Sequence, residues 1–313
     1  MMNELENYLI ASKKYYDKVF DKVEHSNIIN DVDVNLHFKY LQFNPNGIPK
    51  VDKLVEILFS YFTHYCFSSR KRSSEGMNEI EKEQFISSLK DEARELFRKW
   101  KEEDITPDNQ PKAGEVGEMI LWLLTEVILK APQIVAKMDL KTNTQLEVFG
   151  SDGIHVKIDD NDVLNLYFGE AKFYNDIYGA LDSAFESIEK FHEDAMYKRE
   201  YNLVTTHYKH LKQEKQDQIY SYITNQINDD EVKIRHACLI GYDWSEYQKL
   251  SDTNEKQTFI DNFISIYETE TQRLTRLIQT RFDKFSRKEF SFDVFFLPFK
   301  SVQELRDAFN AKL

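Results

Sequence analysis

An apolar strand pattern ends in an acid and a base near the middle of the sequence. In the segment 163–173, apolar residues occupy every second position from Leu164 to Phe168, and Glu170 and Lys172 continue the same alternation. Because alternate side chains of a strand point to one face, these charged residues share a face with the apolar ones. Burying an unpaired charge costs several kcal/mol. Such a break in the pattern marks a candidate functional site.

The preceding strand pattern also ends in a carboxylate. Asp152 stands two positions before Ile154, and apolar residues continue at alternate positions to Ile158. Neighbouring strands lie about 5 Å apart, so a hairpin of these two segments would bring Asp152 close to Glu170 and Lys172. We therefore expect the three charged side chains to meet at one edge of the core.

These residue types are suited to metal-assisted phosphodiester hydrolysis. Two carboxylates about 5 Å apart can share a hard divalent cation, and Mg²⁺ prefers oxygen ligands. Asp152 and Glu170 would hold the metal, and the backbone carbonyl of Ala171 could supply another oxygen. Lys172 would stabilise or orient the attacking water, while the cation offsets charge on the transition state.

A third acid could come from an apolar helix that precedes these strands. Glu115 and Glu118 are three residues apart, so they occupy neighbouring positions on one helix face. Glu118 lies deeper in the apolar stretch, and we favour it as the acid that assists the metal site. Glu115 is more simply explained as an acid near the helix N-terminus, where the helix dipole favours negative charge.

The second part of the chain predicts a mixed sheet flanked by helices. Patterning indicates helices over about 114–130, 177–191, 209–227 and 254–285, and strands over about 134–140, 145–158, 163–173, 232–242 and 290–299. This order of elements is typical of an α/β (α+β) fold.

The first hundred residues predict a smaller, mostly helical α/β domain. A strand pattern covers 34–40, an apolar helix begins at Pro49, and a charged helix runs over about 78–100. The segment 102–112 contains two prolines with Asp and Asn, which is typical of a linker. We therefore predict an N-terminal domain at 1–105, as a partner-binding or regulatory module, and a second domain at 106–313.

The composition limits the classes of function. Of 313 residues, 41 are Lys or Arg and 54 are Asp or Glu, which gives a net charge of −13. Because phosphate binding needs local Lys and Arg, this balance argues against capture of nucleic acid by bulk charge. It allows a local basic groove or a partner that delivers the substrate.

Cysteine usage and hydropathy favour a cytoplasmic protein. Cys66 and Cys238 are too few for a disulfide framework or a four-cysteine zinc site, which indicates a reducing compartment. The longest apolar run, 119–129, is too short to span a bilayer, which needs about 20 residues. The segment 1–10 lacks the basic-then-apolar order of a signal peptide, so we expect no membrane association.

One basic stripe is a candidate DNA-binding surface. Arg273, Arg276, Lys284 and Arg287 recur at spacings that roughly follow one face of a helix. In an acidic chain such a face could contact phosphates. A solvated helix face or a partner interface explains the stripe equally well.

The ordered set of charged residues resembles the PD-(D/E)xK nuclease superfamily. The matching segments are GEVGEMILW with Glu118, GSDGIHV with Asp152, and YFGEAKF with Glu170 and Lys172. The proline of the superfamily's nominal motif is absent, because Ser151 precedes Asp152. The resemblance implies a restriction-endonuclease-like core and a nuclease that uses Mg²⁺, for which Mn²⁺ can substitute.

More closely, the sequence resembles the nuclease subunits (HamA) of Hachiman anti-phage defence systems. The similarity rests on GEVGEMILWLLTE, GSDGIHV and LYFGEAKFY, and on the layout of an N-terminal domain before the nuclease core. It covers most of the chain. It implies a metal-dependent DNase paired with a superfamily 2 helicase subunit (HamB-like), which recognises aberrant or invading DNA and restrains the nuclease until it is triggered.

Two other hypotheses stay open from the residues alone. The chain could be a catalytically inactive, nuclease-like module that binds DNA or acts as a scaffold. Its negative charge and long polar helices also fit a pure interaction protein. For Glu170 and Lys172 by themselves, the simplest alternative to a site is an ion pair at a solvated strand end.

Overall fold

The computed structural model describes residues 4–68, 71–103, 114–134, 151–193, 217, 232–249 and 256–313. The helices are the short η1 (Glu4–Tyr8), α1 (Lys13–Tyr16), α2 (Val51–Ser60), α3 (Phe62–Cys66), α4 (Glu79–Glu103), α5 (Gly114–Leu124), the π-helix η2 (Thr125–Leu129), α7 (Ile177–Glu193), α10 (Glu246–Lys249), α11 (Lys256–Lys284) and α12 (Val302–Asn310). The strands are β1 (Phe20–Lys22), β2 (Val34–Leu41), β3 (Ile154–Ile158), β4 (Leu164–Tyr174), β5 (Val232–Asp243) and β6 (Ser291–Phe299).

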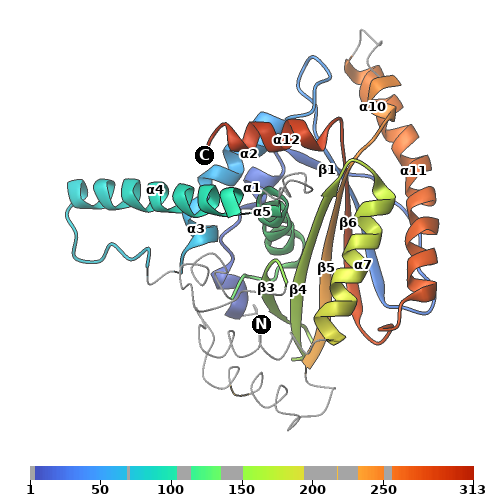
Figure 1. Cartoon of the computed structure of the whole chain (residues 1–313), viewed down its shortest axis with the longest axis horizontal. Helices are drawn as coiled ribbons and strands as arrows, with labels where there is room; N and C mark the ends of the chain where they lie inside the picture. Colours follow the sequence, from blue (N-terminus) through green and yellow to red (C-terminus); the bar gives the residue numbers. More distant parts are fainter. Residues whose placement is uncertain are drawn as a thin grey trace.

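The strands form one six-stranded mixed sheet in the order β1-β2-β6-β5-β4-β3 (Figure 1). The outer pairs, β1 with β2 and β3 with β4, are antiparallel, and the inner pairs are parallel. The mixed α/β architecture predicted from the sequence is therefore confirmed. Parallel strands are covered on both faces, which agrees with the nearly continuous burial along β4, β5 and β6.

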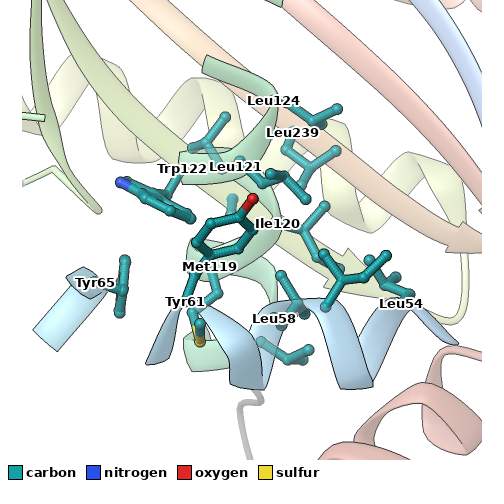
Figure 2. Packing of buried hydrophobic residues seen from close by; sticks show 14 of the residues in the cluster. Leu54, Leu58, Tyr61, Tyr65, Met119, Ile120, Leu121, Trp122, Leu124 and Leu239 are labelled. Carbon is teal, nitrogen blue, oxygen red and sulfur yellow. The ribbon is translucent and has the colours of Figure 1, made fainter. Parts of the chain in front are cut away.

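Helices cover both faces of the sheet (Figure 1). One face packs against α7 and α11, in a cluster that includes Leu181, Ile278 and Phe296. The other face packs against α5, and α5 is covered in turn by α2 and α3. Figure 2 shows this second cluster, in which Met119 and Trp122 of α5 lie among side chains of the other helices. The apolar helix predicted over 114–130 is therefore buried on nearly every side, as its composition indicates.

The N-terminal residues contribute to the same sheet and the same cores. Strand β2 pairs in parallel with β6, so that Val34 lies opposite Phe292. Leu54 and Leu58 of α2 share one hydrophobic cluster with Leu239 of β5. The division into units at 1–105 and 106–313 stays a prediction, but the two segments complete one sheet.

Several predicted elements differ from the structure in detail. The helix at 114–130 continues after Leu124 as the π-helix η2, and Lys130 ends it in a left-handed conformation. Strand β1 was not predicted. The predicted elements at 134–140 and 209–227, and the first part of that at 145–158, lie almost wholly outside the described residues. Within the described ranges, no helix has the length and apolar character needed to cross a membrane.

Two buried histidines meet at the face covered by α7. The Nε2 atoms of His192 and His236 lie 2.9 Å apart, and the ring of Phe290 stacks on His192 with centroids 4.2 Å apart. Burial, with a smaller contribution from Arg287, lowers the pKa of His192 to about 4. Burial also lowers the pKa of His236 well below 6.5, so both rings are neutral in the folded protein.

We expect this pair to make the fold sensitive to acid. An unfolded histidine takes up a proton near pH 6.5, whereas folded His192 does so near pH 4, so protonation in this window favours the unfolded chain. The free energy of unfolding attributable to His192 should fall by about 3 kcal/mol as the pH drops through the window. Urea unfolding of wild type and of His192→Leu at neutral and mildly acidic pH measures this effect. Equal pH dependence of the two proteins would contradict it.

Candidate active site

Glu170 and Lys172 form an ion pair at the C-terminal part of β4. Lys172 Nζ lies 2.6 Å from Glu170 Oε1, which confirms that the two side chains share a strand face. This is the face covered by α7, because Phe168, of the same alternation, packs against Phe191 of α7 with ring centroids 4.9 Å apart. Glu170 is only 8% exposed, so the pair does not sit on a solvated strand end.

Asp152 lies directly beside this pair, just before β3. The antiparallel ladder continues past β3, because Gly169 N donates to Gly153 O at 2.9 Å and Asp152 N donates to Gly169 O at 2.7 Å. The Asp152 side chain then takes the place of the next ladder partner, since Ala171 N donates to Asp152 Oδ2 at 2.7 Å. The structure thus brings Asp152 to the peptide between Glu170 and Lys172.

The surrounding charges keep Lys172 protonated. Burial alone would lower the pKa of the Lys172 ammonium, but the charge and hydrogen bond of Glu170, together with the charge of Asp152, outweigh burial and raise the pKa. Lys172 is therefore a cation at neutral pH. It can hold a negatively charged oxygen, and it does not serve as a proton acceptor in this state.

Glu118 approaches from the opposite side of β4. Its helix, α5, packs on the strand face that carries Gly169 and Ala171, since a Cβ on Gly117 would lie 3.4 Å from Ala171 Cβ. The Tyr65 hydroxyl of α3 donates to Glu118 Oε2 at 3.1 Å. Burial raises the pKa of Tyr65 well above its ordinary value, and the charges of Glu118 and then Asp152 raise it further. Both carboxylates are therefore close to one phenol.

Tyr65 was not anticipated as part of the site. It is buried between Phe97 and Trp122, with ring centroids 6.4 and 6.0 Å away. No local pattern distinguishes it from other aromatic residues of the core, because its role depends on α3 meeting α5 in space (Figure 2).

For the DNA cleavage that the resemblance implies, we expect Tyr65→Phe to reduce the rate about tenfold while leaving the fold intact. The ring would still fill its place, but Glu118 would lose a hydrogen bond to a charged oxygen, which is worth about 1.5–3 kcal/mol. The matched control is Tyr61→Phe. The Tyr61 hydroxyl accepts a hydrogen bond from Ser12 N, and it is not the donor to Glu118. Cleavage rates and the Mn²⁺ concentration for half-maximal rate should change only in Tyr65→Phe.

Two glycines allow the helix and strands to close around Phe173, the residue that follows Lys172. A Cβ on Gly117 would lie 2.7 Å from the Phe173 ring, and a Cβ on Gly241 would lie 2.6 Å from it. Neither distance is accessible to a real side chain. These glycines let α5 and β5 approach the end of β4 closely, and so fix the backbone that carries Lys172.

The donor atoms suit a hydrated, oxygen-liganded cation. Within the described ranges, no group of three or more His, Cys, Asp or Glu side chains is close enough to hold a metal ion. Mg²⁺ often takes only one or two carboxylates and completes its shell with waters and substrate phosphates. Asp152, Glu170 and the Ala171 carbonyl are oxygen donors of this kind. In a strand, that carbonyl points to the same side as the Ala171 N–H, which is toward Asp152.

The basic stripe is partly neutralised by neighbouring acids. Arg273 and Arg287 lie 2.5 and 3.7 Å from glutamate oxygens, whereas Arg276 and Lys284 are exposed on α11. A role of these four residues in DNA binding stays a prediction.

Comparison with known proteins gives one finding for nearly the whole chain. The family model described as HamA matches residues 14–313. No curated protein matches the chain.

Proposed function

Because the chain belongs to the HamA family, and is thus a component of a Hachiman anti-phage defence system, we propose that it is the DNA-cleaving subunit of that system. In this proposal it is a Mg²⁺-dependent deoxyribonuclease of the PD-(D/E)xK type. The single observation that carries the proposal is the meeting of Asp152, Glu170 and Lys172 around the peptide nitrogen of Ala171.

The order of the elements supports a restriction-endonuclease-like core. Helix α5 is followed by the antiparallel pair β3 and β4, then by α7, and then by β5 parallel to β4. The charged residues stand where the antiparallel pair ends, beside the covering helix α5. This position is the one that the resemblance of the three sequence segments implies.

The chain's own oxygen atoms would hold the cation. Asp152, Glu170 and the Ala171 carbonyl are its proposed ligands, with Glu118 assisting directly or through water. When bound, Mg²⁺ or Mn²⁺ would supply Lewis-acid activation of the scissile phosphate. Asp152 also accepts the N–H of the Glu170–Ala171 peptide at 2.7 Å, and so holds the strand backbone beside the proposed ligands.

Lys172 would act on the substrate as a fixed positive charge. Its side chain is only 21% exposed, and its ammonium is held by Glu170 at 2.6 Å. A charge that is already oriented and partly desolvated stabilises developing negative charge on phosphate oxygens without reorganisation. Lys172 would also orient the attacking water through its N–H groups.

We also propose a superfamily 2 helicase subunit, HamB-like, as the partner. The net charge of −13 supports an effector whose DNA is delivered by another subunit, because such an effector needs little affinity of its own. The segment 1–105 would serve as the partner-binding or regulatory module, and 106–313 as the nuclease-like unit. Tyr65 gives the first segment a direct contact with the proposed site.

One observation favours a second candidate, a nuclease-like subunit without chemistry. Glu170 pairs with Lys172 at 2.6 Å and Asp152 accepts the Ala171 N–H at 2.7 Å, so both acids also have a structural explanation. Such a subunit would bind DNA or act as a scaffold, and the same acids would be structural.

Metal dependence separates these candidates. With its helicase partner present, the protein should cut DNA in Mg²⁺ or Mn²⁺, and a chelator should abolish cleavage. Calorimetry should show binding of Mn²⁺ that disappears in an Asp152→Asn, Glu170→Gln double variant. If Mn²⁺ binds neither protein, and no cleavage occurs with the partner, the second candidate is correct.

A further inference from the structure

Two lysines face each other across the β1–β2 pair, at the opposite edge of the sheet from the proposed nuclease site. Lys22 of β1 and Lys39 of β2 are direct antiparallel partners, so their side chains leave the sheet on the same face. Like charges in this arrangement destabilise a strand pair. A pair of this kind is retained at low cost only when negative charge compensates it.

The two lysines are compensated very differently. Lys22 Nζ lies 2.5 Å from Glu24 Oε1 on the surface. Lys39 is only 5% exposed, and its ammonium has no hydrogen-bond or ion-pair partner among the described residues. Burial, followed by the charge of Lys22, lowers the pKa of Lys39 to about 8. The charges of Glu24 and Asp21 offset part of this effect, so Lys39 is a largely buried cation that these acids influence without forming an ion pair with it.

Lys39 lines a cavity of about 420 Å³ between β1, β2, α1 and η2. Lys13 and Lys22 also line this cavity, so three lysine side chains border one space. Its walls include the stacked rings of Tyr16 and Phe20, whose centroids are 5.1 Å apart. A volume of this size is in the range of small-molecule sites, about 300–1,000 Å³.

The acids that line the cavity are each engaged elsewhere. Asp17 pairs with Lys13 at 2.8 Å, Glu24 pairs with Lys22, and Asp21 accepts the backbone N–H of Lys22 at 2.9 Å. In both ion pairs each side chain is at least half exposed, and exposed ion pairs contribute little to the stability of a fold. Lys13 and Lys22 can therefore leave these ion pairs for a more strongly charged anion at little cost in free energy. Lys39 already lines the cavity.

We propose that this cavity binds the phosphate group of a nucleotide-sized ligand, with Lys39 as the central anchor and Lys22 and Lys13 as flanking contacts. Three ammonium groups match the three terminal oxygens of a phosphate monoester better than the two oxygens of a carboxylate, and lysine is a common phosphate ligand. The apolar and aromatic wall suits the rest of a nucleotide. The phosphate could belong to a free mononucleotide or to the 5′ end of a DNA strand.

Calorimetry on the full chain with defined phosphate probes tests the proposal. The probes are inorganic phosphate, thymidine monophosphate, and a short DNA strand with or without a 5′-phosphate. We expect wild type to bind the monophosphate, and Lys39→Met to weaken this binding at least about tenfold. Lys39→Arg should retain part of the affinity. Lys53→Met is the matched control, since Lys53 is an exposed lysine paired with Glu56 on α2.

The probes also separate the two sources of the phosphate. Tighter binding of the mononucleotide than of the phosphorylated strand identifies a free nucleotide, and the reverse order identifies a DNA end. The proposal is overturned if wild type binds none of the phosphate probes at millimolar concentration, because this result requires no variant to fold. Binding that is unchanged in Lys39→Met, or preference for an acidic peptide over every phosphate probe, also overturns it.

Discussion

Replacing Lys172 with methionine is expected to lower the rate of DNA cleavage by about 10²–10³-fold. The substitution keeps roughly the length of the side chain but removes the ammonium that lies 2.6 Å from Glu170. Removal of a single pre-oriented group that stabilises transition-state charge typically has an effect of this size. Single-turnover cleavage by the complete complex, with Mg²⁺ in excess, measures the loss in the chemical step.

Two further variants of the protein separate a loss of catalysis from a loss of folding in this experiment. Lys172→Met removes the ammonium that pairs with the largely buried Glu170, so the double variant Lys172→Met, Glu170→Gln should recover thermal stability but not cleavage. Lys300→Met is the surface control, because Lys300 lies 4.0 Å from Glu304 and is half-exposed. Cleavage by Lys172→Met at the wild-type rate would show that the site is wrongly assigned.

Replacing Asp293 with alanine is expected to cost about 3–5 kcal/mol in the free energy of unfolding. Asp293 is 2% exposed and accepts hydrogen bonds from Asn35, His37 and Arg235 at 3.2, 3.0 and 3.4 Å. Its removal would leave the guanidinium of Arg235, only 13% exposed, without its nearest carboxylate. Because the donors come from β2 and β5, the loss would affect three strands of the sheet together.

The matched control for this prediction is Asp33→Ala. Asp33 also faces Arg235, at 3.7 Å, but its side chain is 65% exposed. Because the Asp33 carboxylate is largely solvated, its longer pair with Arg235 and its hydrogen bond from Ser291 should contribute little, and the control should cost much less than Asp293→Ala. Chemical denaturation of both variants measures the two losses in the free energy of unfolding. Similar losses from Asp33→Ala and Asp293→Ala would show that burial does not govern this cluster.

The convergence at the proposed nuclease site could be predicted because it is nearly local in the sequence. Glu170 and Lys172 are two residues apart on one strand, and a short hairpin connects them to Asp152. Period-two alternation and the hairpin geometry are sufficient for this set. Glu118 was identified on its helix, but only the packing of α5 shows that it comes from the other face of β4.

The features that the sequence did not reveal all depend on distant segments. Strand β1 has only three residues, which is too short for a period to be recognised. The alternation over 34–40 assigns Lys39 to a polar face, but α1 and η2 border the cavity around Lys39, which is only 5% exposed. Tyr65 resembles any core aromatic until α3 is placed beside α5. The alternation of residue types indicates which strand face is polar, but it carries no information about which elements cover that face.

The parallel pairing of β2 with β6 has a consequence for how the chain is made. Val34 pairs with Phe292, which is 258 positions later, so the ribosome must add most of the chain before β2 can find its neighbour. Until then β2 presents an unpaired strand edge, which is a template for aggregation. Biosynthesis of this protein should therefore depend on chaperones that shield nascent chains, and ribosome-bound fragments that stop before residue 291 should be degraded or precipitate.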